Sequence, residues 1–154
     1  MVFGETNRMY EELKERIKKH EGFKLEPYQL SYKTKDGKKV KEDFWTGGYG
    51  HKLLPGEEAP TTQEGWDVLF EKDFEQALNQ ANHFIDKDKI KDEAFTIVIE
   101  MAYQMGSSLQ NFKKMQKALE ENNYVEASDQ MMDSRWANQT PSRASWMALL
   151  MRDL

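Results

Sequence analysis

A glutamate and a threonine twenty-five residues apart are the side chains of this chain best suited to chemistry. Glu21 is followed, at that distance, by the run Thr46-Gly47-Gly48-Tyr49-Gly50-His51. A carboxyl group can deliver a proton, and a hydroxyl group can hold a water molecule. Glycines let the backbone of a turn approach a ligand closely. This set is suited to acid-assisted cleavage of a glycosidic bond, although a lone glutamate at a helix end is usually only a surface residue.

The spacing of apolar residues places Glu21 at the end of a helix over residues 7–21. Apolar side chains recur every three or four positions between Met9 and Ile17, which is the period of one buried helical stripe. Gly22 follows directly and suits the left-handed turn that ends many helices. Glu21 is therefore expected at the C-terminus of this helix.

A hairpin is expected between the two candidate side chains. Strand-like residues run from Phe23 to Lys33 and from Val40 to Thr46, and the Asp36-Gly37 pair between them is a strong signal for a tight turn. Lysines in this hairpin discourage pairing at its edges, and contact with an anionic polymer is the less favoured interpretation. They are Lys33, Lys35, Lys38, Lys39 and Lys41.

The remainder of the chain is predicted to be helical. Thr61 or Thr62 caps a long helix, residues 94–105 are apolar nearly all round and predict a central core helix, and the last helix begins at Thr140-Pro141. The fold class is therefore α+β with two lobes. This single domain, residues 1–154, consists of a β lobe (about 22–60), a connecting helix (about 62–84) and a helical lobe (about 85–154) that includes the first helix (7–21).

Composition excludes several classes of function. The chain has 154 residues, a formal net charge of −5 and no cysteine. This charge argues against a nucleic-acid-binding protein, and the lack of cysteine excludes disulfides and fits a reducing cytosol. No stretch approaches the roughly 18 apolar residues of a membrane span, and residues 1–16 lack the apolar core of a secretion signal. His20, His51 and His83 lie too far apart in sequence to predict a metal site, and no cofactor is expected.

Four blocks of the sequence carry a resemblance to a known family. They are His20-Glu21-Gly22-Phe23-Lys24-Leu25 with Tyr28, Thr46-Gly47-Gly48-Tyr49-Gly50-His51, Met101-Ala102-Tyr103-Gln104-Met105-Gly106, and Ser134-Arg135-Trp136-Ala137-Asn138-Gln139-Thr140-Pro141-Ser142-Arg143-Ala144. In this order, which spans nearly the whole chain, they resemble the phage-type lysozymes of the T-even phages, glycoside hydrolase family 24. The last block is the most specific of the four.

The resemblance implies a lysozyme-like fold and an endo-muramidase. Such an enzyme cleaves the β-1,4 bond between N-acetylmuramic acid and N-acetylglucosamine in peptidoglycan, with inversion. Glu21 matches the general acid that protonates the leaving oxygen, and Thr46 matches the threonine that helps to hold the attacking water. Inverting enzymes keep two carboxyl groups roughly 6.5–9.5 Å apart to admit that water. A second carboxylate is therefore expected near Thr46.

The second carboxylate is where this sequence departs from the family. The family usually has an aspartate nine residues after the glutamate and six before the threonine, and these positions hold Leu30 and Val40 here. About ten extra residues lengthen the hairpin between Glu21 and Thr46. The replacement must therefore come from another acidic residue of the hairpin, or there is none.

Two acidic residues near Thr46 are candidates. If the hairpin folds symmetrically about Asp36-Gly37, Leu30 lies opposite Asp43, and directly opposed residues point to the same face of a sheet. Asp43 would then place its carboxylate where the family has its aspartate. Simple alternation along the strand instead puts Glu42 on the face of Thr46, unless a bulge reverses it. We expect Asp43, with Glu42 or no replacement as the alternatives.

The resemblance also implies supporting roles. Arg143 matches the arginine that pairs with the general acid. Three residues match positions that line the cleft for the sugar chain: Gln104, Trp136 and Thr140. His51 and Asp73 match a partly buried ion pair that stabilises the fold, and we expect acidification through the pKa values of this pair to weaken the fold.

Two other functions remain open. A lytic transglycosylase-like enzyme would use Glu21 alone, and a catalytically silent module would only bind the cell wall. For the muramidase, the resemblance implies bacterial peptidoglycan as the partner. It also implies a monomer that stays in the host cytoplasm until a holin or similar partner allows its export to the wall. Neither nucleic acid nor a membrane is expected as a partner.

Overall fold

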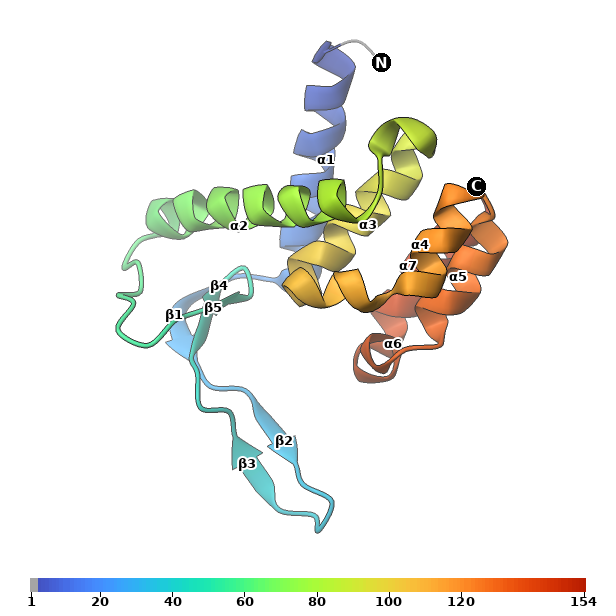
Figure 1. Ribbon diagram of the computed structural model, residues 1–154. Helices are drawn as coiled ribbons and strands as arrows, with labels where there is room; N and C mark the ends of the chain where they lie inside the picture. Colours follow the sequence, from blue (N-terminus) through green and yellow to red (C-terminus); the bar gives the residue numbers. More distant parts are fainter. Residues whose placement is uncertain (1–2) are drawn as a thin grey trace. The chain divides into compact units, whose positions relative to one another are not determined.

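The computed structural model describes residues 3–154, and its residue contacts divide the chain into two compact units (Figure 1). One unit ends at Phe74, and the other runs from Glu75 to Leu154. Residues 1–2, the first two of the stretch in which the sequence predicts no secretion signal, lie outside the described residues. The α+β fold class is confirmed. The lobe boundaries expected from the sequence stay a prediction.

The first helix, α1 (Phe3–Glu21), confirms the helix that the sequence predicts and begins four residues earlier than expected. Its stripe is buried at Leu13 and Ile17, which are 2% and 0% exposed. The helix ends at Gly22, whose φ of 72° is left-handed and whose N–H donates to the Lys18 carbonyl at 2.9 Å. The end of α1 is thus set by a glycine, and Glu21 is its last residue.

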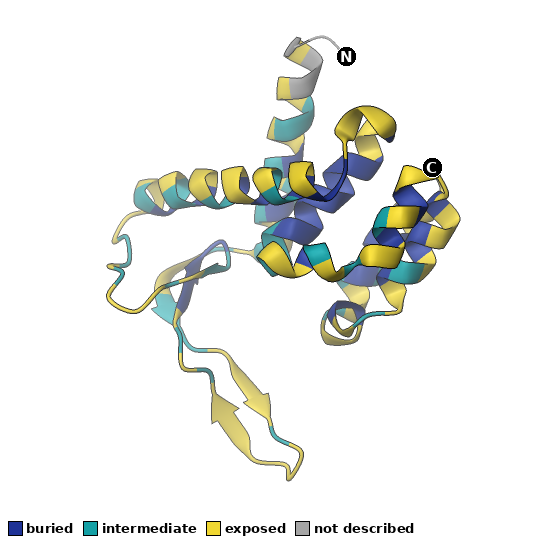
Figure 2. Ribbon diagram, viewed as in Figure 1, coloured by how far each residue is buried: buried dark blue, intermediate teal, exposed yellow. Residues whose placement is uncertain are grey.

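The expected hairpin is divided into two sheets. Strands β1 (Lys24–Tyr28), β4 (Thr46–Gly48) and β5 (His51–Lys52) form an antiparallel sheet in the order β1-β4-β5. Strands β2 (Ser31–Lys33) and β3 (Lys39–Lys41) form a separate two-stranded ribbon with the Asp-Gly turn at its tip. Figure 2 shows that β4 is buried whereas β2 and β3 are exposed along their whole length.

A tryptophan of the long helix α2 (Gln63–Phe84) fixes the position of β4. Trp66 is 1% exposed, and its indole N–H donates to the Leu25 carbonyl of β1 at 2.9 Å. A Cβ atom on Gly47 or on Gly48 would lie 2.7 Å or less from carbons of this ring. The glycines of β4 are therefore required by the close approach of the indole to the backbone. Thr62 caps α2, as expected, because its Oγ1 accepts from the Gly65 N–H at 3.1 Å.

The second unit is helical and surrounds a buried central helix, α3 (Asp92–Met105). Every residue from Ala94 to Ala102 is buried, which confirms the predicted core helix, and Gly106 ends it. Helix α5 packs against α4 and α7, and α7 also contacts α3 and α6. The remaining elements are η1 (Lys87–Lys89), η2 (Gly106–Asn111), α4 (Lys113–Glu120), α5 (Tyr124–Met132), α6 (Arg135–Gln139) and α7 (Pro141–Arg152). Within the described part of the chain, no helix has the length and apolar character needed to cross a bilayer.

Candidate active site

The carboxyl group of Glu21 lies against the glycine-rich turn that follows β4. A Cβ atom built on Gly50 would lie 3.2 Å from Cδ of Glu21 and closer still to its Oε1. Gly50 also has a φ of 79°, a left-handed conformation that favours glycine. The two features that stand out in the sequence, the glutamate and the glycine turn, are therefore in contact within the first unit.

Thr46 begins β4, where it pairs with Tyr28 of β1 and Lys52 of β5. The residue is only 3% exposed. Its Oγ1 is buried, and none of the residues that the structure describes forms a hydrogen bond with it. Because buried hydroxyl groups normally have a partner, this atom stands out as one that a ligand or a water molecule would satisfy.

The register of the β2–β3 ribbon differs from the expected one. Ser31 lies opposite Lys41, and the N–H of Glu42 donates to the Leu30 carbonyl at 2.8 Å. Leu30 therefore faces Glu42, and the expected pairing of Leu30 with Asp43 is wrong.

The turn at the tip explains this one-residue difference. Thr34 N–H donates to the Lys38 carbonyl at 2.8 Å, so the strands are joined by a three-residue loop centred on Asp36. Gly37 takes the left-handed conformation in this loop, with a φ of 85°. The symmetric two-residue turn assumed from the sequence would be centred between Asp36 and Gly37. Asp36 itself accepts from the Thr34 hydroxyl, and this bond lowers the pKa of its carboxyl group.

The two candidate carboxylates differ in burial. Asp43 is exposed, whereas Glu42 is partly buried, and its Oε2 is buried without a hydrogen-bond partner among the described residues. The role of Asp43 as the second carboxylate stays a prediction. The pairing of Asp43 with Leu30, from which it was argued, is not found.

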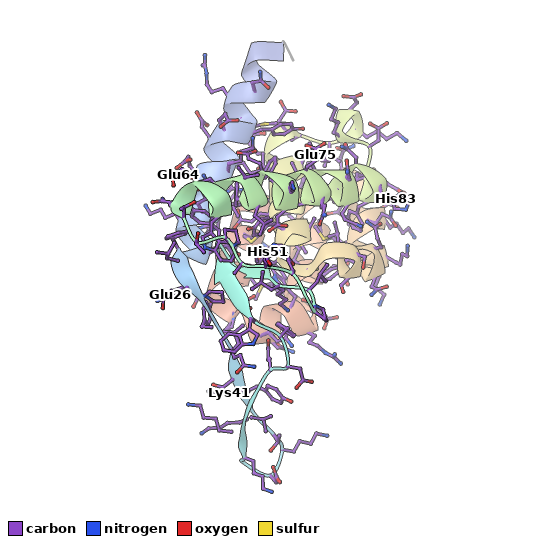
Figure 3. The ribbon with its side chains drawn as sticks, turned by 90° about the vertical axis from the view of Figure 1, so that its left-hand side faces the viewer. Glu26, Lys41, His51, Glu64, Glu75 and His83 are labelled. Carbon is purple, nitrogen blue, oxygen red and sulfur yellow. The ribbon has the colours of Figure 1, made fainter. Side chains whose placement is uncertain are left out.

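His51 forms hydrogen bonds with two carboxylates. Its Nδ1 lies 2.7 Å from Oδ2 of Asp73 on α2, which confirms the expected pair, and its Nε2 lies 2.9 Å from Oε2 of Glu57. Glu57 follows β5 in a loop and was not predicted. Figure 3 shows His51 beneath α2, whereas Lys41 lies out along the ribbon. The hydrogen bond to Asp73 raises the pKa of His51 above its usual value, although burial opposes the shift.

This raised pKa predicts that acidification through the pKa of His51 stabilises the fold, whereas the expectation from the sequence is that acidification weakens it. Protonated His51 is favoured by the fold, so its contribution to stability is complete below about pH 6.5, its value in an unfolded chain, and is lost as the pH rises through the pKa of the folded state. Acidification through the pKa of His51 therefore strengthens the fold. We expect guanidinium unfolding to give a smaller free energy at pH 9 than at pH 6.

Substitution of Asp73 tests the origin of this pH dependence. Asp73→Asn is expected to cost about 1.5–3 kcal/mol at pH 6, the usual range for a hydrogen bond to a charged group, and to flatten the decline toward pH 9. Glu71→Gln is the control, because the Glu71 carboxylate pairs with Lys14 at the protein surface. An unchanged slope in Asp73→Asn would show that the pair does not set the pH dependence.

In the second unit, Arg143 has a partner that was not predicted. Its Nε donates to Oε2 of Glu100 at 3.1 Å, and its Nη2 lies 3.1 Å from the same oxygen. The Glu100 side chain is 0% exposed. The one signal in the sequence is that Glu100 is an acidic residue inside the apolar run of residues 94–105. The pairing of Arg143 with the general acid, which the resemblance implies, stays a prediction.

The other three predicted binding residues are joined by hydrogen bonds. The indole N–H of Trp136 donates to Oε1 of Gln104 at 3.2 Å, and the Thr140 hydroxyl donates to the Trp136 carbonyl at 3.0 Å. The hydroxyl of Thr140 therefore does not cap α7, although Thr140 directly precedes the helix. Helix α3, helix α6 and the residue that joins α6 to α7 thus bring these residues, spread over 37 positions, into one group.

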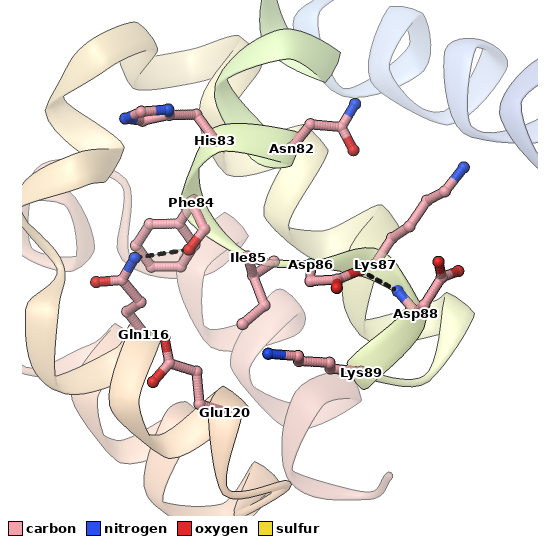
Figure 4. A pocket seen from close by; sticks show the side chains of 10 residues that line it. All are labelled: Asn82, His83, Phe84, Ile85, Asp86, Lys87, Asp88, Lys89, Gln116 and Glu120. Atoms are coloured by element: carbon pink, nitrogen blue, oxygen red, sulfur yellow. Dashed lines mark hydrogen bonds between the residues drawn. The ribbon is translucent and has the colours of Figure 1, made fainter.

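A pocket of about 420 Å³ lies elsewhere in the second unit, at the end of α2 (Figure 4). Acidic and basic side chains alternate along one wall, from Asp86 to Lys89, and Gln116 Nε2 donates to the Phe84 carbonyl at 2.6 Å. None of the predicted site residues lines it. In the part of the chain that the structure describes, no three His, Asp or Glu side chains are grouped as a metal site requires.

Comparison with known proteins gives a consistent result. The family model described as Phage lysozyme matches residues 18–152. The chain is 31% identical to "Probable T4-type lysozyme 2" of Dictyostelium discoideum, over 89% of this chain and 91% of that protein. It is 27% identical to "Probable T4-type lysozyme 1" of the same organism, with the same two coverages. The matched range contains every site residue described above, from Glu21 to Arg143.

Proposed function

The chain belongs to the phage lysozyme family, and we propose that it is an inverting endo-muramidase that cleaves the β-1,4 bond between N-acetylmuramic acid and N-acetylglucosamine. Peptidoglycan hydrolase activity follows from the family itself. The observation that carries the finer proposal is the contact of the Glu21 carboxyl group with the turn at Gly50, next to the strand that holds the unpartnered hydroxyl of Thr46.

In this mechanism, Glu21 donates its proton to the glycosidic oxygen as the bond to the anomeric carbon breaks. Thr46 Oγ1 helps to hold a water molecule that attacks the anomeric carbon from the opposite face of the sugar. A carboxylate takes a proton from this water, because a neutral hydroxyl group is too weak a base. The product has the inverted configuration at the anomeric carbon.

Residues of the second unit are proposed to bind the glycan: Gln104, Trp136, Thr140 and Arg143. The hydrogen bonds that join the first three support a common role. Arg143 offers a guanidinium that Glu100 already orients, and an oriented side chain loses less entropy when it binds a ligand. Monomeric action on the wall, after export from the host cytoplasm with the help of a holin, is likewise proposed from the family.

Analysis of the products tests the proposed reaction. We expect the purified protein to lower the turbidity of permeabilised bacteria and to release muropeptides with reducing ends, because water is the nucleophile. Mass spectrometry distinguishes these ends from the anhydro sugars that a transglycosylase would leave. Anhydro products would show that the enzyme is a transglycosylase and not a hydrolase. Binding to peptidoglycan without any loss of turbidity would instead identify a silent wall-binding module.

A further inference from the structure

We propose that Glu42, rather than Asp43, is the second carboxylate of the site and holds the attacking water together with Thr46. This inference rests on the proposed function, because it names the base of that reaction. Three observations on the described residues carry it: the pairing of the strands, the pattern of burial and two buried polar atoms without partners.

The strand pairing brings Glu42 and Thr46 together. Thr46 pairs with Tyr28, and the N–H of Glu42 donates to the carbonyl of Leu30. Tyr28 ends β1 and Leu30 directly precedes β2, so these two partners are only two residues apart in the chain. Glu42 and Thr46, four positions apart, are therefore both held against this short stretch.

The pattern of burial places Glu42 on the side of Thr46. Residues 42–45 connect β3 to β4 outside both sheets. Exposure alternates along this stretch: Glu42 and Phe44 are partly buried and Thr46 is buried, while Asp43 and Trp45 are exposed. Alternation of this kind puts Glu42, and not Asp43, on the buried side with Thr46.

Glu42 and Thr46 each have a buried oxygen atom that can bind a water molecule. No described residue forms a hydrogen bond with Glu42 Oε2 or with Thr46 Oγ1, and both atoms are buried. An unsatisfied buried group costs about 1–3 kcal/mol, and more when it is charged, so a protein keeps such atoms where they have a role. A bound water needs polar partners of this kind, and an ionised carboxylate accepts the hydrogen bond that such a water donates.

Two hydrogen bonds fix the main chain at Glu42. Besides the bond from its own N–H to Leu30, its carbonyl accepts from Gln29 Nε2 at 3.1 Å. Leu30 is one of the two positions that match the family's aspartate, and directly opposed, hydrogen-bonded residues have Cα atoms about 5.5 Å apart. Glutamate is one methylene longer than aspartate, which lets its carboxylate reach across part of this offset. The lengthened ribbon has moved the carboxylate to the neighbouring strand.

The proton and bond changes balance with this assignment. The water oxygen forms a bond to the anomeric carbon of N-acetylmuramic acid, and the proton that the water loses goes to Glu42. The bond between that carbon and the glycosidic oxygen breaks, and the oxygen takes the proton of Glu21. Exchange of one proton between the two carboxyl groups and solvent restores both for the next turnover.

Two matched substitutions test the proposal. We expect Glu42→Gln to lower kcat about 10²–10³-fold with little change in KM, because the amide can hold water but cannot take its proton. Asp43→Asn is expected to keep at least half of the wild-type kcat. The melting temperature of Glu42→Gln should not fall, because an uncharged amide costs less to bury than an unpaired carboxylate. A purely structural Glu42 would instead show a lower melting temperature with kcat retained.

Other outcomes separate this proposal from the function on which it rests. Loss of kcat in Asp43→Asn with retention in Glu42→Gln would assign the base to Asp43. Retention in both variants, with a wild-type protein that releases reducing ends, would overturn the Glu42 assignment and leave the muramidase standing. An inactive wild-type protein would contradict both the proposed function and the assignment of Glu42 as its base.

Discussion

Glu21→Gln is expected to lower the turnover of peptidoglycan by about 10³–10⁴-fold, at the upper end of the range for proton transfer by a side chain. Glutamine has the shape of glutamate and keeps a hydrogen-bonding group against the turn, but it has no acidic proton. The glycosidic oxygen would then leave as an unprotonated alkoxide, which is a poor leaving group. The effect should fall on kcat and leave KM within about threefold of the wild type.

The position of Glu21 makes this substitution easy to interpret. The carboxyl group lies so close to Gly50 that a Cβ atom there would clash with it, and glutamine fits the same space because it has the shape of glutamate. Glu26→Gln is the control, since it makes the same chemical change on the exposed part of β1, close in sequence to Glu21 (Figure 3). Initial rates of turbidity loss measure both variants. If Glu21→Gln kept more than a tenth of the wild-type rate, Glu21 would not be the general acid.

The helices could be predicted from the sequence because their signals are local. A stripe with the period of a helix, a threonine cap and a glycine end are properties of neighbouring residues, and they gave the end of α1, the start of α2 and the core helix α3. The Asp36-Gly37 turn was also predicted. Its loop length was not, because two- and three-residue loops both place a glycine in the left-handed conformation.

This one-residue uncertainty in the turn decided the prediction for the second carboxylate. A shift of one residue changes every cross-strand pair of the ribbon, and it moved the partner of Leu30 from Asp43 to Glu42. The connection between β3 and β4, at positions 42–45, adds a second uncertainty, because its conformation does not follow from the strand pattern. Local patterns could name the acidic candidates, but the choice between them depends on how the strands pair.

Two contacts were missed because only the folded chain brings the partners together, one across 43 positions and one across six. Glu57 and Glu100 contact His51 and Arg143 through the fold, and neither contact follows from spacing along the chain. Glu57 also accepts from the Leu54 N–H at 2.8 Å, so one carboxylate orders its loop and binds the histidine. A charged residue within an apolar stretch, such as Glu100, is the signal that deserves a search for a distant partner.

The pair of Glu100 and Arg143 is expected to have the largest effect on stability. Arg143→Met removes the positive partner of a carboxylate that is 0% exposed, and breaking a buried pair in this way costs about 3–5 kcal/mol. For a chain of this size, that corresponds to a melting temperature lower by about 10 °C. Guanidinium unfolding measures the free energy directly. Arg152→Met is the control on the same helix, because the pair of Arg152 with Asp129 is exposed and should contribute less than about 1 kcal/mol.

A second substitution separates the two roles proposed for Arg143. Glu100→Leu combined with Arg143→Met replaces the pair by apolar groups, which is often neutral for stability, so the double variant should recover most of the lost free energy. If Arg143 also binds the glycan, the double variant will regain stability without regaining the wild-type KM. Recovery of both would limit Arg143 to a structural role. A cost below about 1 kcal/mol for Arg143→Met, with no coupling between the two sites, would show that the pair does not stabilise the fold.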